Sequence, residues 1–298
     1  MKKAFVNAAL HFLAFFMAVC FLQITGSFTS YAEEDGRPDY QIRINRAANC
    51  ITIYERDDSG TFSIPVRVFA CSTGKAASGT PLGTYKTSSY YQWHEMFGGT
   101  YTQYAVRVNN HIMLHSIPYN SANPASMNWK QYNMLGEKAS MGCIRLACAD
   151  AKWIYENCRP GTEVVIYDDA ENPGPLGKPE MMEISADSPL RGWDPTDLNE
   201  KNPWNSVRPS IYLKNDIGDD MLYIPLGAGV DTVKGELGMK NANGALYNTD
   251  EYSLNIYGNY NLNKAGIYKI YITGTEKSTG MRVDKEMTMY VLENMREV

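Results

Sequence analysis

The chain has 298 residues, of which 44% are hydrophobic and 20% are charged, and its formal net charge at pH 7 is −5. An acidic chain of this kind argues against nucleic acid or an anionic surface as the main partner, because those partners attract clustered lysines and arginines. The length suits two domains of ordinary size.

The first 32 residues have the features of an export signal. Lys2 and Lys3 give a positive start, residues 8–24 are almost wholly apolar, and Ser30-Tyr31-Ala32 offers small residues where a signal peptidase cuts. We expect residues 1–32 to be removed, which shifts the net charge from −5 to −7 and places the protein outside the cytoplasm. The alternative is an uncleaved membrane anchor, because the apolar run is near the length that spans a bilayer.

Five cysteines follow this segment: Cys50, Cys71, Cys143, Cys148 and Cys158. An odd number leaves at least one thiol unpaired within a monomer, as a nucleophilic cysteine must be. The other four either form two disulfides, which suits an exported protein, or are reduced core residues, and the sequence leaves both readings open. The spacings His111-x3-His115 and Cys143-x4-Cys148 do not match a structural zinc site, so we expect neither a metal nor another cofactor.

Residues 39–168 predict a mostly β domain with one clear helix. Alternating or β-branched runs at 40–44, 50–54 and 62–70 indicate strands, and 104–108 and 112–114 indicate a hairpin around Asn109-Asn110. The helix covers 148–157, because Ala151, Ile154 and Tyr155 are spaced i, i+3, i+4 and Pro160-Gly161 follows. A closing strand is predicted at 163–167.

The rest of the chain divides into a linker and a second β module. Residues 169–209 hold seven of the fourteen prolines, and Trp193 and Trp204 indicate that this linker packs on a domain. Residues 210–298 contain alternating runs at 252–257, 266–272 and 287–291 separated by turns, which is typical of a small β-sandwich.

A Cys/His pair is the strongest chemical signal in the chain. Cys143 follows Gly142 in the polar turn Ser140-Met141-Gly142, and His115 ends an apolar run. An imidazole is the usual group that activates a thiol as a nucleophile. The Ser116 carbonyl is placed to fix the tautomer of His115, while the Gly142 and Cys143 N–H groups are candidates for an oxyanion hole. Arg145 is a candidate to bind a carboxylate or to brace the loop. His111 is a weaker candidate for the base, and His94 could line a pocket.

These residues resemble the active-site motif of the L,D-transpeptidases of bacterial cell walls. The resemblance rests on Ser-x-Gly-Cys-Ile-Arg-Leu at 140–146 after a strand ending in His-Ser, and on the segments 71–74 and 80–85, and it covers about residues 39–168. It implies a β-sandwich-like catalytic domain in the cell wall or outside the cell, acting on peptidoglycan stem peptides. The cysteine forms an acyl-enzyme on the third stem residue, releases terminal D-Ala, and passes the acyl group to an amine of another stem.

The resemblance assigns roles by position. Cys143 matches the nucleophile, His115 the base, Ser116 the residue that orients the base, and Gly142 part of the oxyanion hole. Ser140, Met141 and Arg145 then line the substrate site, and either Tyr101 or Tyr104 matches an assisting tyrosine. The C-terminal module more weakly resembles bacterial immunoglobulin-like domains, which implies a spacer or wall-binding role.

Two departures from the family pattern leave room for another acceptor, including water. Met141 stands where most members have histidine, and the segment Asn120–Lys138 is longer than usual, which suggests a lid or a substrate-binding insertion. The alternative functions are a sortase-like transpeptidase and a non-catalytic wall-binding protein. In a sortase, however, the arginine lies on a later strand than the cysteine, whereas Arg145 here is two residues away.

Overall fold

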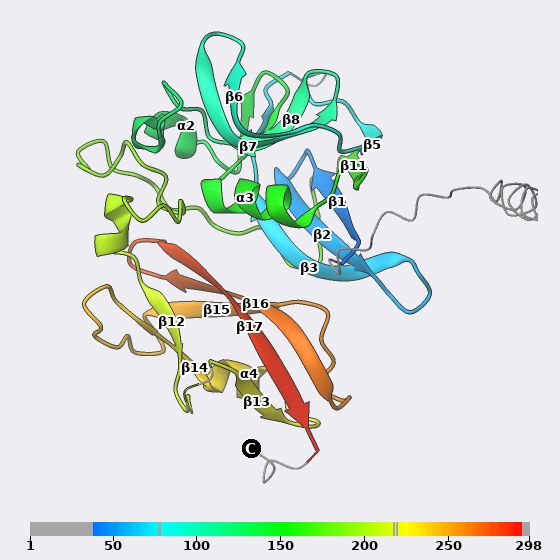
Figure 1. Ribbon diagram of the computed structural model, residues 1–298, viewed down its shortest axis with the longest axis vertical. Helices are drawn as coiled ribbons and strands as arrows, with labels where there is room; N and C mark the ends of the chain where they lie inside the picture. The colour runs from blue at the N-terminus through cyan, green and yellow to red at the C-terminus, as the bar shows by residue number, and fades with distance from the viewer. Residues whose placement is uncertain (1–37, 77–78, 217, 219, 294–298) are drawn as a thin grey trace, which may run out of the picture. The chain divides into compact units, whose positions relative to one another are not determined.

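The computed structural model describes residues 38–76, 79–216, 218 and 220–293 (Figure 1). The predicted export segment therefore lies outside the described residues. Within the described part of the chain no helix is long and apolar enough to cross a membrane. The described residues form mainly β-strands, as the sequence predicts.

A five-stranded sheet contains the strands predicted near both ends of the first domain. Its order is β3-β2-β1-β11-β5, with β1 at Tyr40–Asn45, β2 at Cys50–Arg56, β3 at Phe62–Ala70, β5 at Gly83–Lys86 and β11 at Glu163–Tyr167. The pairs β1–β2 and β2–β3 are antiparallel, whereas β11 runs parallel to β1. The strand that closes the predicted domain therefore pairs with the strand that opens it.

A four-stranded sheet carries the predicted hairpin. Its order is β10-β8-β7-β6, with β6 at Tyr90–Met96, β7 at Thr100–Asn109, β8 at Ile112–Ser116 and β10 at Ile144–Leu146. The hairpin β7–β8 is antiparallel as predicted, and β10 runs parallel to β8. A short parallel pair, β4 at Thr73–Gly74 and β9 at Lys138–Ser140, lies just before the cysteine turn.

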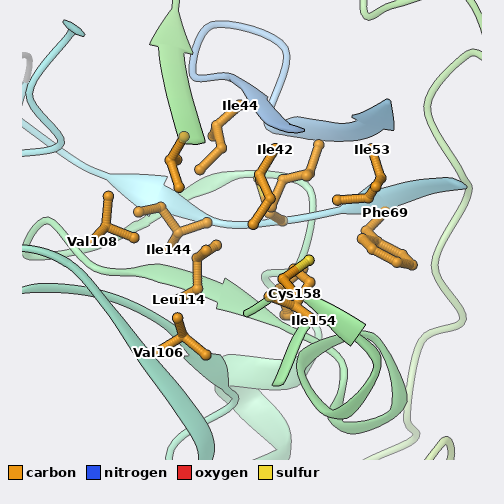
Figure 2. Packing of buried hydrophobic residues seen from close by; sticks show 14 of the residues in the cluster. Ile42, Ile44, Ile53, Phe69, Val106, Val108, Leu114, Ile144, Ile154 and Cys158 are labelled. Atoms are coloured by element: carbon orange, nitrogen blue, oxygen red, sulfur yellow. The ribbon is translucent and has the colours of Figure 1, made fainter. Parts of the chain in front are cut away.

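The main hydrophobic core lies among these two sheets and the helix α3 at Cys148–Asn157, which matches the predicted helix (Figure 2). Ile42, Ile44 and Ile53 come from the first sheet, Leu114 from the second, and Ile154 from α3, and none is more than 1% exposed. Burying one such side chain is worth about 1.5–3 kcal/mol. This core fixes β8 and β10 to α3.

Residues 169–209 pack against the first domain, in agreement with their tryptophan content. Trp204 lies in the short helix η2 at Pro203–Ser206 and is buried with Tyr119 and Tyr132 in a second cluster. The segment 120–138 contributes to the same cluster through η1 at Pro124–Ser126 and α2 at Trp129–Tyr132. The predicted lid is therefore largely a packed part of the domain.

The C-terminal residues form two sheets around a core of their own. Strands β12 (Ser210–Leu213) and β14 (Leu237–Lys240) pair, and a four-stranded sheet has the order β13-β17-β16-β15. Its strands are β13 at Leu222–Pro225, β15 at Tyr252–Tyr257, β16 at Gly266–Glu276 and β17 at Arg282–Leu292, and the helix α4 spans Val230–Gly235. Apolar side chains of both sheets share one cluster. The likeness to an immunoglobulin-like domain stays a prediction.

A buried ion pair joins this module to the first domain. Arg282 of β17 donates a hydrogen bond to the carboxylate of Asp150 in α3, and it lies 3.3 Å from Asp284. Beside this pair, the ring of Tyr271 packs edge-on to that of Trp153 at 5.9 Å between centroids. The C-terminal module is thus anchored on α3.

Candidate active site

The parallel pairing of β8 and β10 brings the predicted nucleophile and base to one face of the sheet. Arg145 lies opposite His115 and Ile144 lies opposite Leu114. Cys143 precedes Ile144, so it continues the register opposite Met113. Side chains alternate along a strand, so residues two apart share a face. His115, Cys143 and Arg145 therefore project from the same side.

A cavity of about 460 Å³ opens on this side. Eight of its lining residues were singled out from the sequence: His94, His111, His115, Ser140, Met141, Gly142, Cys143 and Arg145. The rest of the lining comes from three places: the β6–β7 hairpin (Glu95, Met96, Phe97, Thr100 and Arg107), the start of β8 (Ile112 and Met113) and Pro118, two residues after β8.

Cys143 differs from the other cysteines in its exposure. All five cysteines in the described part of the chain are free thiols. The structure therefore corresponds to the alternative in which the four other cysteines are reduced core residues and not disulfides. Cys50, Cys71, Cys148 and Cys158 are buried, whereas Cys143 is only partly buried. A soluble reagent or substrate therefore reaches Cys143 more readily than the other thiols.

His115 is held as a neutral base with a fixed tautomer. Its Nδ1 lies 2.5 Å from the Ser116 carbonyl oxygen, which only accepts, so Nδ1 carries the proton. The Ser116 hydroxyl accepts the Gln103 N–H at 2.8 Å and so anchors the end of β8. Nε2 is buried and has no hydrogen-bond partner among the described residues. Burial lowers the pKa of His115 to about 4, with the nearby charges of Arg145 and His94 acting in the same direction.

The Cys143 thiol is also neutral at rest. Burial raises its pKa, and this outweighs a backbone hydrogen bond at Met113 and the charges of Arg145 and Arg107, which act the other way. The thiol donates to the carbonyl oxygen of His111 at 3.4 Å. Because the thiol and the His115 imidazole line the same cavity and are both neutral at rest, a proton transfer between them would accompany the attack rather than precede it.

The turn before Cys143 is fixed by hydroxyl groups and by glycine. Gly142 has φ +153°, and a Cβ there would lie 2.3 Å from the Gly79 carbonyl oxygen, so no other residue fits. The Thr80 hydroxyl donates to the Gly142 carbonyl at 2.7 Å, and the Ser140 hydroxyl donates to the Cys143 carbonyl at 2.6 Å. This bracing holds Cys143 at the mouth of the cavity.

The two N–H groups predicted to form the oxyanion hole differ in whether they already donate a hydrogen bond in this turn. The Gly142 N–H donates to the Ser140 hydroxyl at 3.0 Å, so it is engaged in this conformation. The Cys143 N–H has no acceptor among the described residues. Cys143 is therefore the better placed of the two predicted donors, and Gly142 serves mainly to allow the close approach to Gly79.

Arg145 links the cysteine strand to the long insertion. Its guanidinium donates to the Gln131 side-chain oxygen and to the Ala139 carbonyl, the latter at 3.3 Å. Its backbone exchanges two 2.9 Å hydrogen bonds with Ser72. Of the insertion 120–138, no residue lines the cavity, so the expectation of a lid over the thiol is not met in this conformation. Met141 lies at the rim and is 81% exposed.

The two candidate tyrosines lie away from the cavity. Tyr104 packs its ring against Tyr155 of α3 at 5.6 Å, and Tyr101 packs on the cluster that contains Tyr119. Neither belongs to the residues that line the cavity. Arg107 does line it and was not singled out from the sequence. The predicted hairpin could have identified it, because Arg107 pairs with Met113 on the face that carries His115.

Comparison with known proteins finds a family match for the first domain. The family model of the L,D-transpeptidase catalytic domain matches residues 39–166. A curated protein of Bacillus subtilis strain 168, described as "Putative L,D-transpeptidase YciB", is 42% identical over 66 residues, which are 22% of this chain and 33% of that protein. The chain thus spans a third of the length of this curated relative.

Solved structures give likenesses of lower identity. An L,D-transpeptidase from Mycobacterium smegmatis is 19% identical with a TM-score of 0.35, covering 44% of this chain and 59% of that one. A fused Zn-dependent amidase/peptidase/peptidoglycan-binding protein from Clostridium acetobutylicum is 21% identical with a TM-score of 0.34, covering 46% and 56%. Residues 39–166 therefore resemble an L,D-transpeptidase catalytic domain.

Proposed function

We propose that this protein is an exported peptidoglycan L,D-transpeptidase with Cys143 as its nucleophile and His115 as its base. The observation that carries the proposal is the paired ends of β8 and β10, which direct both side chains into one cavity. The fixed tautomer of His115 supports it, because Nε2 is left free to accept a proton. The substrate class follows from the family match over residues 39–166.

In the first step the enzyme is acylated by a tetrapeptide stem. Cys143 Sγ attacks the carbonyl carbon of the third stem residue while Nε2 of His115 takes the thiol proton. The oxyanion that forms is stabilised by the Cys143 N–H. The C–N bond to the terminal D-Ala then breaks, and His115 returns the proton to the departing amine. The products are a thioester on Cys143 and free D-Ala.

In the second step the thioester is resolved by an amine or by water. The side-chain amine of another stem attacks the thioester carbon, and His115 removes a proton from the attacking nitrogen. The C–S bond breaks, Sγ takes the proton from His115, and a link between two third residues is formed. Attack by water instead gives a free tripeptide stem. The exposed rim at Met141 leaves both acceptors access.

The remaining predicted residues position the reacting groups. Ser116 orients His115, Ser140 and Gly142 hold the cysteine turn, and Arg145 supplies positive charge beside the thiol. The partners are therefore stem peptides, which lie outside the cytoplasm and require export. Contact with a membrane is proposed only for the case in which the N-terminal segment stays uncleaved.

The test is to incubate the purified protein with a disaccharide-tetrapeptide and to identify the products by mass. We expect release of D-Ala together with tripeptide or a cross-linked dimer, and no products from Cys143→Ala. A sortase-like enzyme would leave this substrate unchanged and cleave a sorting-type peptide instead. A non-catalytic wall-binding protein would release no D-Ala and would show no thiol more reactive than the others.

A further inference from the structure

The candidate active-site cavity contains positive charge that no acidic side chain of the described residues neutralises. Arg107 and Arg145 both line it, and neither forms an ion pair among the salt bridges of the described chain. Glu95 is the one carboxylate in the lining, and the salt bridges of the described residues include no pair between it and either guanidinium. In a chain with a net charge of −5, two unneutralised arginines in a cavity indicate an anionic ligand.

The two arginines differ in what holds them. Arg145 is tied to the insertion through Gln131 and to the Ala139 carbonyl, so it braces the loop. Arg107 donates to the carbonyl of Asn110, at the turn of its own hairpin, and hydrogen bonds with the hydroxyl of Tyr91. A guanidinium has five N–H donors, so Arg107 keeps donors for a ligand while these two interactions hold the planar group in place.

The position of Arg107 relates it to the reacting atoms. It lies opposite Met113 across the β7–β8 pair, on the face that carries His115. Its charge acts on the Cys143 thiol, where it opposes the effect of burial on the pKa. In a tetrapeptide donor the terminal carboxylate is separated from the scissile nitrogen by a single carbon. A residue that binds this carboxylate must therefore line the cavity that holds the thiol, as Arg107 does.

We propose that Arg107 binds the free terminal carboxylate of the donor stem and is the residue that selects stems ending at the fourth position. The inference rests on the proposed function and names a specificity residue for that site. A guanidinium recognises a carboxylate through two parallel charge-assisted hydrogen bonds. In a stem with a fifth residue the same carboxyl is an uncharged amide, which leaves the arginine unpaired in the cavity.

The experiment compares two substrates that differ only in this charge. With the full chain, kcat/KM is measured for two substrates. One is a tetrapeptide with a free C-terminal carboxylate, which releases D-Ala, and the other is its C-terminal amide, which releases D-alaninamide. The wild type is expected to prefer the acid by about 10- to 100-fold. Arg107→Gln lowers kcat/KM for the acid by a similar factor and changes that for the amide less than about threefold, so the preference disappears. Arg107→Lys, which keeps the charge but loses the fork, retains an intermediate preference.

Controls separate this inference from the proposed function. Lys86→Gln removes an exposed cation of β5 and should leave both rates unchanged, and thermal melting of each variant checks the fold. Equal rates of the wild type on acid and amide, or equal losses on both in Arg107→Gln, would overturn the role of Arg107 and leave the transpeptidase proposal intact. If the wild type releases nothing from either peptide, the proposed function fails and this inference fails with it.

Discussion

The burial that keeps His115 neutral affects the stability of the protein as well as its catalysis. His115 is 2% exposed, and burial holds its pKa at about 4, below the ordinary value of 6.5. As pH falls from about 6.5 to 4 the unfolded chain takes up a proton that the folded chain does not. The stability that His115 contributes is therefore complete above pH 6.5 and is lost toward pH 4.

We predict that the free energy of unfolding decreases over this window by up to about 3 kcal/mol through His115 alone. The measurement is denaturant unfolding at a series of pH values for the wild type and His115→Gln. The variant should show a shallower decrease. His111→Gln is the matched control and should keep the wild-type slope, whereas identical slopes in wild type and His115→Gln would show that His115 is not held neutral.

Met141 tests which residues of the motif take part in the chemical step. It is 81% exposed at the rim of the cavity. Its thioether side chain cannot take the proton of the Cys143 thiol as a histidine could. We expect Met141→Ala to keep acylation within about threefold of the wild type and to increase the ratio of hydrolysed tripeptide to cross-linked dimer, because water reaches the thioester more easily. A loss of acylation by several orders of magnitude would place Met141 in the chemistry.

Among single residues, the sequence pattern places the motif beside the cavity but does not place the two tyrosines. The cysteine turn and the strand that ends in His115 are local patterns, so their placement beside one cavity follows once β8 and β10 pair. Tyr104 could not be placed in this way. It has φ +52°, and this left-handed residue interrupts the alternation of β7, so its ring packs on α3. Nothing in the residue order indicates such a break.

At the scale of elements, α3 shows how a distant segment completes a predicted helix. Its N-cap residue, Ala147, has no side chain that caps the helix. Asp194 accepts the Cys148 N–H at 2.9 Å, and the Thr196 hydroxyl accepts the Ala149 N–H at 3.0 Å. The periodicity of residues 148–157 predicts the helix, but a cap supplied from 46 residues away cannot be read from local sequence.

We predict that Asp194→Ala lowers the free energy of unfolding by about 1–2 kcal/mol, the usual value of an N-cap. Asp187→Ala, which changes an exposed acid in the same segment, is the control and should stay within about 0.5 kcal/mol of the wild type. Chemical denaturation of the three proteins gives the comparison. Equal stabilities would mean that water replaces Asp194 at the helix end.

The packing of residues 169–209 also bears on where the first domain ends. A fragment of residues 33–175 lacks both Asp194 and Trp204, whereas one of residues 33–209 keeps them. We expect the longer fragment to melt at a clearly higher temperature and the shorter one to expose the cluster around Tyr132. Equal melting temperatures would show that residues 176–209 act only as a linker, as their prolines alone predict.

At the scale of the whole molecule, the buried pair of Asp150 and Arg282 ties the C-terminal module to the helix that follows the cysteine strand. Asp150 is fully buried, and the Arg282 side chain is 9% exposed. Alternating strand patterns predict the β-structure of the C-terminal module. They do not predict its contact with α3, because Asp150 and Arg282 are 132 residues apart in the sequence. Removing one member of a buried pair leaves an uncompensated charge.

We predict that Arg282→Leu lowers the free energy of unfolding by about 3–5 kcal/mol. The double variant Asp150→Leu/Arg282→Leu should recover a large part of this loss, because neither charge is then left unpaired. Urea unfolding of both variants and the wild type tests the coupling. If the double variant is less stable than Arg282→Leu, the pair is not the main contact between α3 and β17.

The proposed reaction requires that Cys143 becomes acylated by a stem peptide with the loss of D-Ala. The most direct measurement is the intact mass of the protein after brief exposure to a tetrapeptide stem, followed by peptide mapping. We predict one adduct with the mass of the stem less D-Ala, located on Cys143 and absent from Cys143→Ala. The free energy of unfolding of this variant should stay within about 2 kcal/mol of the wild type. No adduct on the folded wild type, or an adduct that persists in Cys143→Ala, would contradict the proposed reaction.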